Sequence, residues 1–350
     1  MKRFWIILAF VLCGSFSTES AMAETDVSET CWSKFWTRYE QIENQIKRSC
    51  RECTERWYGD RIQPDYGLTC LANSEPSSHE SIVVFVHGFN SRPEDLKSLV
   101  RETQQAGFRC VTFRYPNDQS LTKSAQFLAE ELASLKGRLA VVTHSMGGLI
   151  VREAIENPEL DPGNVRQLIQ ITPPNHGTQL ARFAVSMDVV EYLMSEDRRQ
   201  ESGFIYGSIL DGLAEASDDM SPDSEFLKTL NSRPRHPDVQ YTLVLGTEAP
   251  IDPTAFAATR RCVSWLGNRW EWVDTAKTTL KSHLTEFDEL IDGRGDGIVS
   301  VRRARLSGVT DLIVGQFDHA DLLSEAPNPA ARKAREQILK RLQLPLTHSD

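Results

Sequence analysis

The chain lacks an excess of positive charge and is poor in glycine and proline. Lysine and arginine number 39 against 49 aspartates and glutamates, which gives a formal net charge of −10 at pH 7. A nucleic-acid-binding protein normally has a basic face and a high isoelectric point, so the charge argues against that class. Twenty glycines and 16 prolines in 350 residues are too few for a collagen-like or generally disordered chain. The composition is that of a globular protein with one large domain or two average ones.

Long apolar runs are absent, and the one short run of note lies at the N-terminus, over residues 4–12. Lys2 and Arg3 precede it, and Ala21-Met22-Ala23 follows with the small-x-small pattern that a signal peptidase cuts. At about nine residues, the run is too short to span a bilayer of about 30 Å as a helix. We therefore expect residues 1–23 to be a signal peptide and the mature protein to be exported, either periplasmic or secreted.

Cysteine is scarce over most of the chain and concentrated near its start. Six cysteines follow the signal peptide: Cys31, Cys50, Cys53, Cys70, Cys110 and Cys262. An even number in an oxidising compartment favours disulfides. Cys50-x-x-Cys53 has neither a second such pair nor a histidine pair nearby, as a zinc site would need. We therefore predict a cysteine-rich helical extension over residues 24–78, with disulfides mainly among the four cysteines of residues 31–70.

Apolar strands and helical segments alternate from residue 81 onward. The pattern predicts strands at residues 81–86, 109–113, 139–143, 165–171, 240–245 and 312–317, with helices at residues 121–136, 146–156 and 329–342. Alternation at this pitch indicates an α/β fold, a mostly parallel sheet with helices on both faces. Two irregular inserts, at about residues 178–238 and 249–292, interrupt the pattern and are expected to form a lid or cap. The predicted domain therefore spans residues 79–345.

A serine lies between a predicted buried strand and the helix after it, in Thr143-His144-Ser145-Met146-Gly147-Gly148. A sharp strand-to-helix turn at this point raises the serine hydroxyl above the sheet, and the turn needs small residues because neighbouring elements crowd it. Gly147 meets this need, whereas Thr143 stands where glycine is usual. Ser145 is therefore the candidate nucleophile.

Four motifs in one order resemble the α/β-hydrolase fold and, within it, the lipase and esterase branch. They are His87-Gly88-Phe89-Asn90, the Ser145 turn, Thr172-Pro-Pro-Asn-His-Gly-Thr178 and Gly295-Asp296-Gly297-Ile298-Val299-Ser300. The resemblance covers about residues 80–345 and leaves the extension and both inserts unexplained. Calcium supports some bacterial lipases of this kind, but no ligand set is recognisable here, so we predict neither a metal nor a cofactor.

A serine of ordinary pKa needs a base, and the base needs a carboxylate that fixes its tautomer. The resemblance implies His319 as the base, since it follows the last predicted strand. Asp296, between two glycines in a tight loop, is the chosen acid, and the order Ser145, Asp296, His319 is that of the fold. Glu248 and Asp252 are rival acids because they closely follow the strand at residues 240–245.

The remaining motif residues are given supporting roles. Two main-chain N–H groups must stabilise the oxyanion, and the fold implies those of Met146 and Phe89. His87 and His144 belong to the motif loops and are expected to shape turns. His176 is interpreted as a structural residue of its loop.

These features predict a serine hydrolase that cleaves carboxylic esters, with an ester or acyl-lipid substrate and contact with a lipid surface. Thioester, amide or acyl-transfer chemistry would use the same triad and stays open, because the fold does not fix the leaving group or the acceptor. A second class is a catalytically silent hydrolase fold used for binding. The joint presence of nucleophile, acid, base and both oxyanion loops favours the enzyme. No partner protein is predicted.

Overall fold

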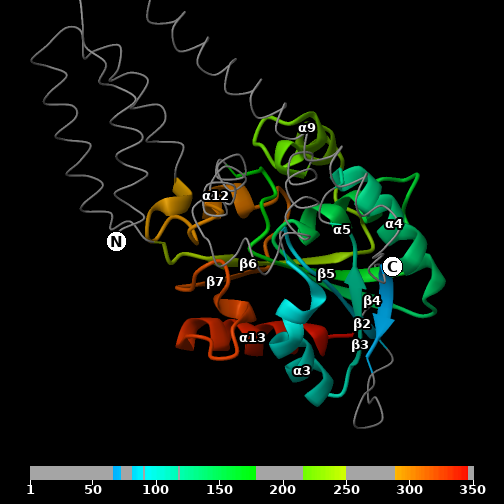
Figure 1. The fold of residues 1–350 in the computed structure, drawn as a ribbon, viewed down its shortest axis with the longest axis horizontal. Coiled ribbons are helices and arrows are strands. Elements are labelled where there is room, and N and C mark those ends of the chain that lie inside the picture. Colours follow the sequence, from blue (N-terminus) through cyan, green and yellow to red (C-terminus); the bar gives the residue numbers. More distant parts are fainter. Residues whose placement is uncertain are drawn as a thin grey trace, which may run out of the picture. The chain divides into compact units, whose positions relative to one another are not determined.

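A seven-stranded sheet lies at the centre of the fold (Figure 1). The computed structural model describes residues 66–71, 81–89, 91–116, 119–178, 216–249 and 288–345. Their strands are β1 (Gly67–Cys70), β2 (Ile82–Val86), β3 (Arg109–Arg114), β4 (Leu139–His144), β5 (Val165–Ile171), β6 (Gln240–Gly246) and β7 (Leu312–Gly315). The spatial order is β1-β3-β2-β4-β5-β6-β7. β1 runs antiparallel to β3, and every other neighbouring pair is parallel.

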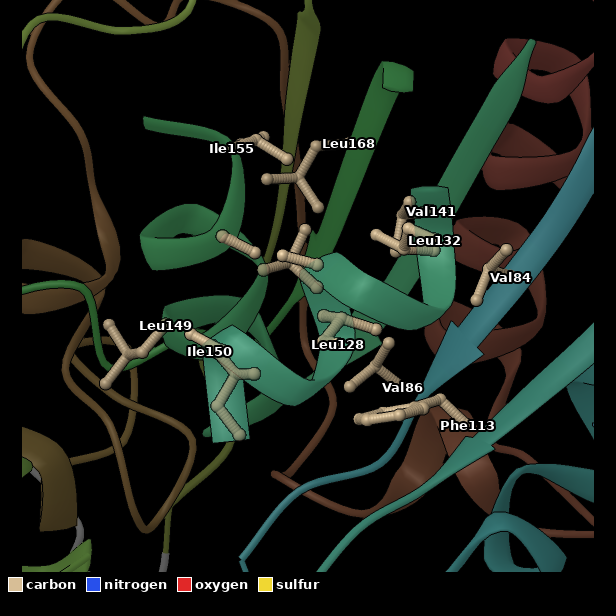
Figure 2. Close-up of a cluster of buried hydrophobic side chains, with 14 of the residues drawn as sticks. Val84, Val86, Phe113, Leu128, Leu132, Val141, Leu149, Ile150, Ile155 and Leu168 are labelled. Carbon is tan, nitrogen blue, oxygen red and sulfur yellow. The ribbon is translucent and has the colours of Figure 1, made fainter. Parts of the chain in front are cut away.

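Helices α4 (Leu121–Ser134) and α5 (Gly147–Glu156) cover one face of this sheet. Leu128 and Leu132 of α4 meet Val84 and Val141 of the sheet in a fully buried cluster (Figure 2). Burying one such side chain contributes about 1.5–3 kcal/mol relative to leaving it in water. This layer therefore anchors α5, whose first turn follows Ser145.

Helices α3 (Lys97–Gln105) and α13 (Pro329–Leu342) cover the opposite face. The strand residues alternate between the two layers, so that β2 is apolar throughout: Val83 and Phe85 contact this layer, and Val84 and Val86 contact the other. Strands buried on both faces have such continuous apolar runs. Asn328 caps α13 by accepting a hydrogen bond from the Ala331 N–H, at 2.8 Å.

Shorter elements follow the strand ends. The 3-10 turns are η1 (Pro93–Leu96), η2 (Asp288–Leu290) and η3 (Asp321–Leu323), and the helices are α9 (Glu225–Ser232) and the one-turn α12 (Val301–Ala304). α9 lies within the first predicted insert, and no strand occurs in the part of that insert that is described, residues 216–238. The described residues contain no helix long and apolar enough to cross a membrane.

The predicted fold class is confirmed, and several element ends differ from the prediction. The strand predicted to reach Phe317 ends at Gly315, because the Phe317 N–H bonds back to the Gly315 carbonyl and turns the chain. The helix predicted to reach Lys136 ends at Ser134, since Leu135 is extended and Gly137 has a φ of +100°.

The sheet begins earlier than predicted. β1 lies inside the segment assigned to the N-terminal extension and pairs with β3 at the sheet edge. Its Leu68 N–H also donates to Glu131 of α4, at 2.8 Å. Cys70, expected to form a disulfide, has an exposed free thiol, and Cys110 has a buried free thiol. Cys31, Cys50, Cys53 and Cys262 lie outside the described residues, as do the signal peptide and most of the extension.

Candidate active site

Ser145 directly follows β4, at the carboxyl end of that strand. Its φ is +51°, in the left-handed region that non-glycine residues rarely occupy. The Ser145 N–H donates to the Ile171 carbonyl at 2.9 Å, and its carbonyl accepts from Gly148. The serine is therefore held in the strained strand-to-helix turn that the sequence predicts.

Two glycines after Ser145 let neighbouring strands approach this turn. A Cβ on Gly147 would lie 2.5 Å from the His87 carbonyl oxygen and 2.8 Å from that of Val86. A Cβ on Gly148 would lie 2.6 Å from Gln170 Nε2 and 3.3 Å from Thr143 Oγ1. The open space at Gly148 thus accommodates the buried threonine that replaces the usual glycine.

A second strained residue follows β5. Thr172 has a φ of +47°, which is an outlier for a β-branched side chain. Its N–H donates to the Val244 carbonyl at 2.8 Å, so main-chain bonding holds this conformation. The motif of residues 172–178 therefore leaves the sheet through a sharp turn, as the chain does at Ser145.

His319 and Asp296, the predicted base and acid, are in hydrogen-bond contact. His319 Nδ1 lies 2.9 Å from Asp296 Oδ2, and the His319 N–H donates to the Asp296 carbonyl at 3.0 Å. The Asp296 side chain is 2% exposed and that of His319 is 16% exposed. A carboxylate on Nδ1 fixes the tautomer that leaves Nε2 free to accept a proton.

The loop around Asp296 fixes this carboxylate. Asp296 Oδ1 accepts hydrogen bonds from the main-chain N–H groups of Ile298 and Val299, at 2.9 and 2.7 Å. Gly297 has a φ of +93°, and its N–H bonds to the Glu289 carbonyl. One carboxylate oxygen is thus bound by the loop while the other faces His319.

The rival acid Glu248 lies apart from this pair. Its side chain is exposed, and its Oε2 accepts a hydrogen bond from Asn328 at 3.3 Å. Loss of hydration and the nearby charges of Asp321, Asp318 and Asp292 raise the Glu248 pKa. Asp252 lies outside the described residues. Among the described carboxylates, Asp296 is the one that contacts the His319 ring.

His144 has a contact that sequence reasoning missed. Its Nε2 lies 2.9 Å from the main-chain carbonyl of His319. Because a carbonyl only accepts, Nε2 carries the proton and donates. The two rings lie 4.9 Å apart between centroids, and burial lowers the His144 pKa from 6.5 to about 3. A neutral His144 therefore connects the Ser145 turn to the main chain of His319.

His87 holds the other loop beside the serine. It stacks on Tyr115 with ring centroids 4.2 Å apart, and its carbonyl accepts a hydrogen bond from the Tyr115 hydroxyl at 2.7 Å. Burial lowers the His87 pKa from 6.5 to about 4. A Cβ on the next residue, Gly88, would lie 3.0 Å from Ser145 Cβ. The loop therefore packs directly against Ser145.

The two predicted oxyanion donors belong to Met146, the residue after Ser145, and to Phe89, in the loop that contacts Ser145. Met146 is buried at the start of α5, and Phe89 follows Gly88 and packs partly buried against the apolar layer. Neither main-chain N–H donates to another group in the described part of the chain. Their assignment to an oxyanion site stays a prediction.

His176 has contacts within its loop region. The His176 N–H donates to the Arg303 carbonyl at 2.8 Å, and its Nδ1 lies 3.4 Å from Asn231 Nδ2. Its contacts are those of a loop residue, as interpreted from the sequence.

Across the described residues, no group of three or more histidine, cysteine, aspartate or glutamate side chains could hold a metal ion.

Comparison with known proteins identifies the family. Residues 83–337 match the sequence profile described as "Alpha/beta hydrolase family". This range is most of the chain and contains Ser145, Asp296 and His319. The chain therefore belongs to the alpha/beta hydrolase family. Sequence comparison with curated proteins gives no match.

Solved structures agree with this fold. The mature form of the lipase BlEst2 from Bacillus licheniformis is 18% identical and has a TM-score of 0.52, over 82% of this chain and 100% of that chain. The propeptide form of the same lipase is 18% identical and has a TM-score of 0.54, over 83% of this chain and 56% of that chain. At this identity, the likeness establishes the fold.

Proposed function

We propose that this alpha/beta hydrolase cleaves carboxylic esters through Ser145, His319 and Asp296. The observation that carries the proposal is the 2.9 Å contact between His319 Nδ1 and Asp296 Oδ2. His144, the residue before Ser145, also contacts the His319 carbonyl at 2.9 Å, and Ser145 itself is held in a strained turn. A carboxylate-bound histidine beside a strained serine is the arrangement that activates a hydroxyl nucleophile.

The proposed reaction has two halves. The Ser145 oxygen attacks the ester carbonyl carbon while His319 Nε2 takes the hydroxyl proton, and Asp296 stabilises the imidazolium. The tetrahedral intermediate then expels the alcohol, which receives the proton from His319. In the second half, His319 activates a water molecule that attacks the acyl-enzyme and releases the acid and free Ser145.

Stabilisation of the oxyanion is assigned to the N–H groups of Met146 and Phe89. Both are main-chain groups of the loops beside Ser145, so they are oriented before the substrate arrives. Preorganised donors of this kind typically contribute about 10²–10³ in rate each. Their side chains would affect substrate packing more than chemistry.

The proposed substrates are acyl esters of lipids. The Ile298 side chain is 40% exposed although it lies two residues from the buried Asp296. An exposed apolar side chain beside the acid provides a surface that an acyl chain would cover. The likeness to a B. licheniformis lipase is in keeping with this substrate class.

Labelling by a fluorophosphonate probe tests the nucleophile. The wild-type chain should label and should hydrolyse p-nitrophenyl esters, whereas Ser145→Ala should do neither while keeping its thermal transition. Ser232→Ala is the matched control, because that hydroxyl is exposed and bonds to the Thr229 carbonyl of its own helix. Labelling of Ser145→Ala at the wild-type level would contradict the assignment, and a panel of p-nitrophenyl esters of increasing length would report the preferred acyl chain.

Export through residues 1–23 and disulfides in the extension belong to the same proposal. They are supported by the basic and apolar pattern before Ala23 and by the even cysteine number. The mature chain is expected to begin at Glu24 in the periplasm or the medium. N-terminal sequencing of the exported protein tests this start directly.

A further inference from the structure

Asn175 lies at the centre of a buried polar network behind the candidate active site. Its side chain is fully buried and has four hydrogen-bond contacts, as many as an amide group can make. Oδ1 accepts from Arg152 and Gln170 at 3.2 and 3.3 Å, while Nδ2 donates to the Ala304 carbonyl and to Gln170 at 2.8 and 3.4 Å. Because every donor and acceptor of the Asn175 amide has a partner, the network fixes the orientation of this side chain.

One branch of the network reaches the nucleophile helix. Arg152, on α5, binds Glu156 of the same helix through two contacts of 3.1 Å, and both side chains are fully buried. Arg152 uses its remaining Nη1 on Asn175 and Asn231. Gly148 is three residues after Ser145, and Gln170 packs directly against it: a Cβ on Gly148 would lie 2.6 Å from Gln170 Nε2. Asn175 thus touches two side chains that support the Ser145 turn.

The other branch reaches the acid loop through α12. The last carbonyls of this one-turn helix have no partner within the helix, and Asn175 Nδ2 and the His176 N–H bind those of Ala304 and Arg303. α12 in turn closes the loop that carries Asp296, because the Val301 N–H donates to the Arg294 carbonyl at 2.8 Å. The network therefore joins the nucleophile helix to the element beside the acid.

We infer that Asn175 is a positioning residue that sets the alignment of Ser145 with the Asp296–His319 pair. The inference rests on the proposed function and concerns how that site is held. Asn175 connects α5 and α12, which are far apart in sequence and each adjacent to one part of the triad. It touches neither the substrate nor the reacting atoms.

The discriminating variant is Asn175→Asp. It keeps the side-chain shape and the acceptor toward Arg152 but places a carboxylate oxygen against the Ala304 carbonyl, so the side-chain link to α12 is lost while the His176 main-chain bond to Arg303 remains. A misplacement of about 1 Å in an active site can cost about 10² in rate. We expect kcat for p-nitrophenyl butyrate to fall by about 10²-fold, with KM changed by less than about threefold.

Asn231→Asp is the matched control. Asn231 lies on α9 and contacts the same Arg152 at 3.1 Å, and its Nδ2 donates to the Asn175 carbonyl, yet it has no contact with α12. If the network only stabilises the fold, both variants should lower the thermal transition and kcat alike. If Asn175 aligns the triad, Asn231→Asp should keep kcat within about threefold of the wild type.

A second comparison uses the variant His319→Ala. Residues that act as one unit have non-additive effects, so adding Asn175→Asp to His319→Ala should leave the residual rate of fluorophosphonate labelling unchanged. A further loss of about 10²-fold in that background would overturn the inference, as would a wild-type kcat in Asn175→Asp.

If Asn175→Asp does not fold, the variant Gln170→Leu tests the inference instead. This variant removes two of the four contacts of Asn175 and keeps that with Ala304, so we expect an intermediate loss in kcat of about 10-fold. A folded Gln170→Leu with wild-type kcat would count against the inference. Should the wild-type chain neither label nor hydrolyse any ester, the proposed function itself would fall, and the inference with it. An active wild type with unaffected variants overturns the inference alone.

Discussion

At the scale of single residues, the proposed reaction depends on the carboxylate that contacts His319. Replacing Asp296 by asparagine keeps the side-chain shape but removes the charge that fixes the histidine tautomer. By analogy with the buried aspartate of a serine protease, Asp296→Asn should lower kcat by about 10⁴-fold. Glu248→Gln is the control, because Glu248 is exposed and bonds to Asn328. A crippled Glu248→Gln together with a mild Asp296→Asn would reverse the assignment of the acid.

The sequence indicates the residues with local signatures and misses those defined by distant contacts. Ser145 and His319 each lie in a short motif after a strand, and Asp296 lies in a glycine-bounded loop before the last strand, so local patterns indicate all three as candidates. His144 and Asn175 lie within the Ser145 motif and the motif of residues 172–178. Their hydrogen-bond partners are the His319 and Ala304 carbonyls, more than 120 residues away in sequence. Every residue has a main-chain carbonyl, so the residue types in a sequence do not indicate which carbonyl accepts such a bond.

At the scale of elements, α13 contacts the segment that follows His319. Arg335 is 2% exposed, and its Nε donates to the Leu322 carbonyl at 2.9 Å. Its Nη2 donates to the Ser324 carbonyl, and its Nη1 pairs with Glu102 of α3. The Arg335 guanidinium therefore holds the segment just after His319 through its hydrogen bonds to two main-chain carbonyls.

Arg335→Lys should loosen that segment. A lysine keeps the charge but lacks the planar fork that reaches three partners, and hydrogen bonds to charged groups contribute about 1.5–3 kcal/mol each. We expect the unfolding free energy to fall by about 2–4 kcal/mol and kcat to fall with it. Arg341→Lys, on the same helix with its partner Asp311 half-exposed, should cost less than about 1 kcal/mol. Urea denaturation of both variants measures the difference, and equal losses would contradict it.

Elements with strong periodicity were predictable almost to the residue, and weak ones were not. β5 and α13 have the predicted bounds because an apolar residue stands at each end of β5, among four in seven positions, and a proline begins α13. β1 was assigned to the extension, since four residues with one buried position give no alternating pattern. What makes it a strand is its pairing with β3, which local sequence does not encode.

At the scale of the whole molecule, two buried histidines make stability depend on pH. Burial lowers the pKa of His144 to about 3 and that of His87 to about 4, from 6.5. The unfolded chain therefore binds protons below pH 6.5 that the folded chain does not. Stability is full above about pH 6.5 and is lost as the pH falls, by up to about 1.4 kcal/mol per pH unit for each histidine.

Urea denaturation between about pH 7 and pH 5 measures this dependence, because carboxylates titrate mainly below about pH 4.5. His144→Gln keeps a donor for the His319 carbonyl but removes one titrating group. The variant should therefore lose stability less steeply than the wild type over this interval. An unchanged slope would mean that His144 is not the neutral buried group described above.

The free thiols provide a test of the cysteine prediction. Cys70 is exposed, whereas burial raises the pKa of Cys110 to about 12 and keeps it protonated and unreactive. Native protein should therefore react with a maleimide at Cys70 and leave Cys110 untouched. The denatured, unreduced mature chain should show both thiols, the other four cysteines being bridged. Cys70→Ser should abolish native labelling, and six reactive thiols after denaturation would refute the bridges.

The antiparallel strand β1 has a consequence for any attempt to produce the catalytic part alone. A fragment begun at residue 79, just before the first parallel strand, would leave the outer edge of β3 with a row of unpaired N–H and C=O groups. Such an edge is a template for another chain, so the shortened protein would be prone to associate through its strands. β1 therefore protects this edge from intermolecular pairing, and a fragment meant to remain monomeric should begin before Gly67.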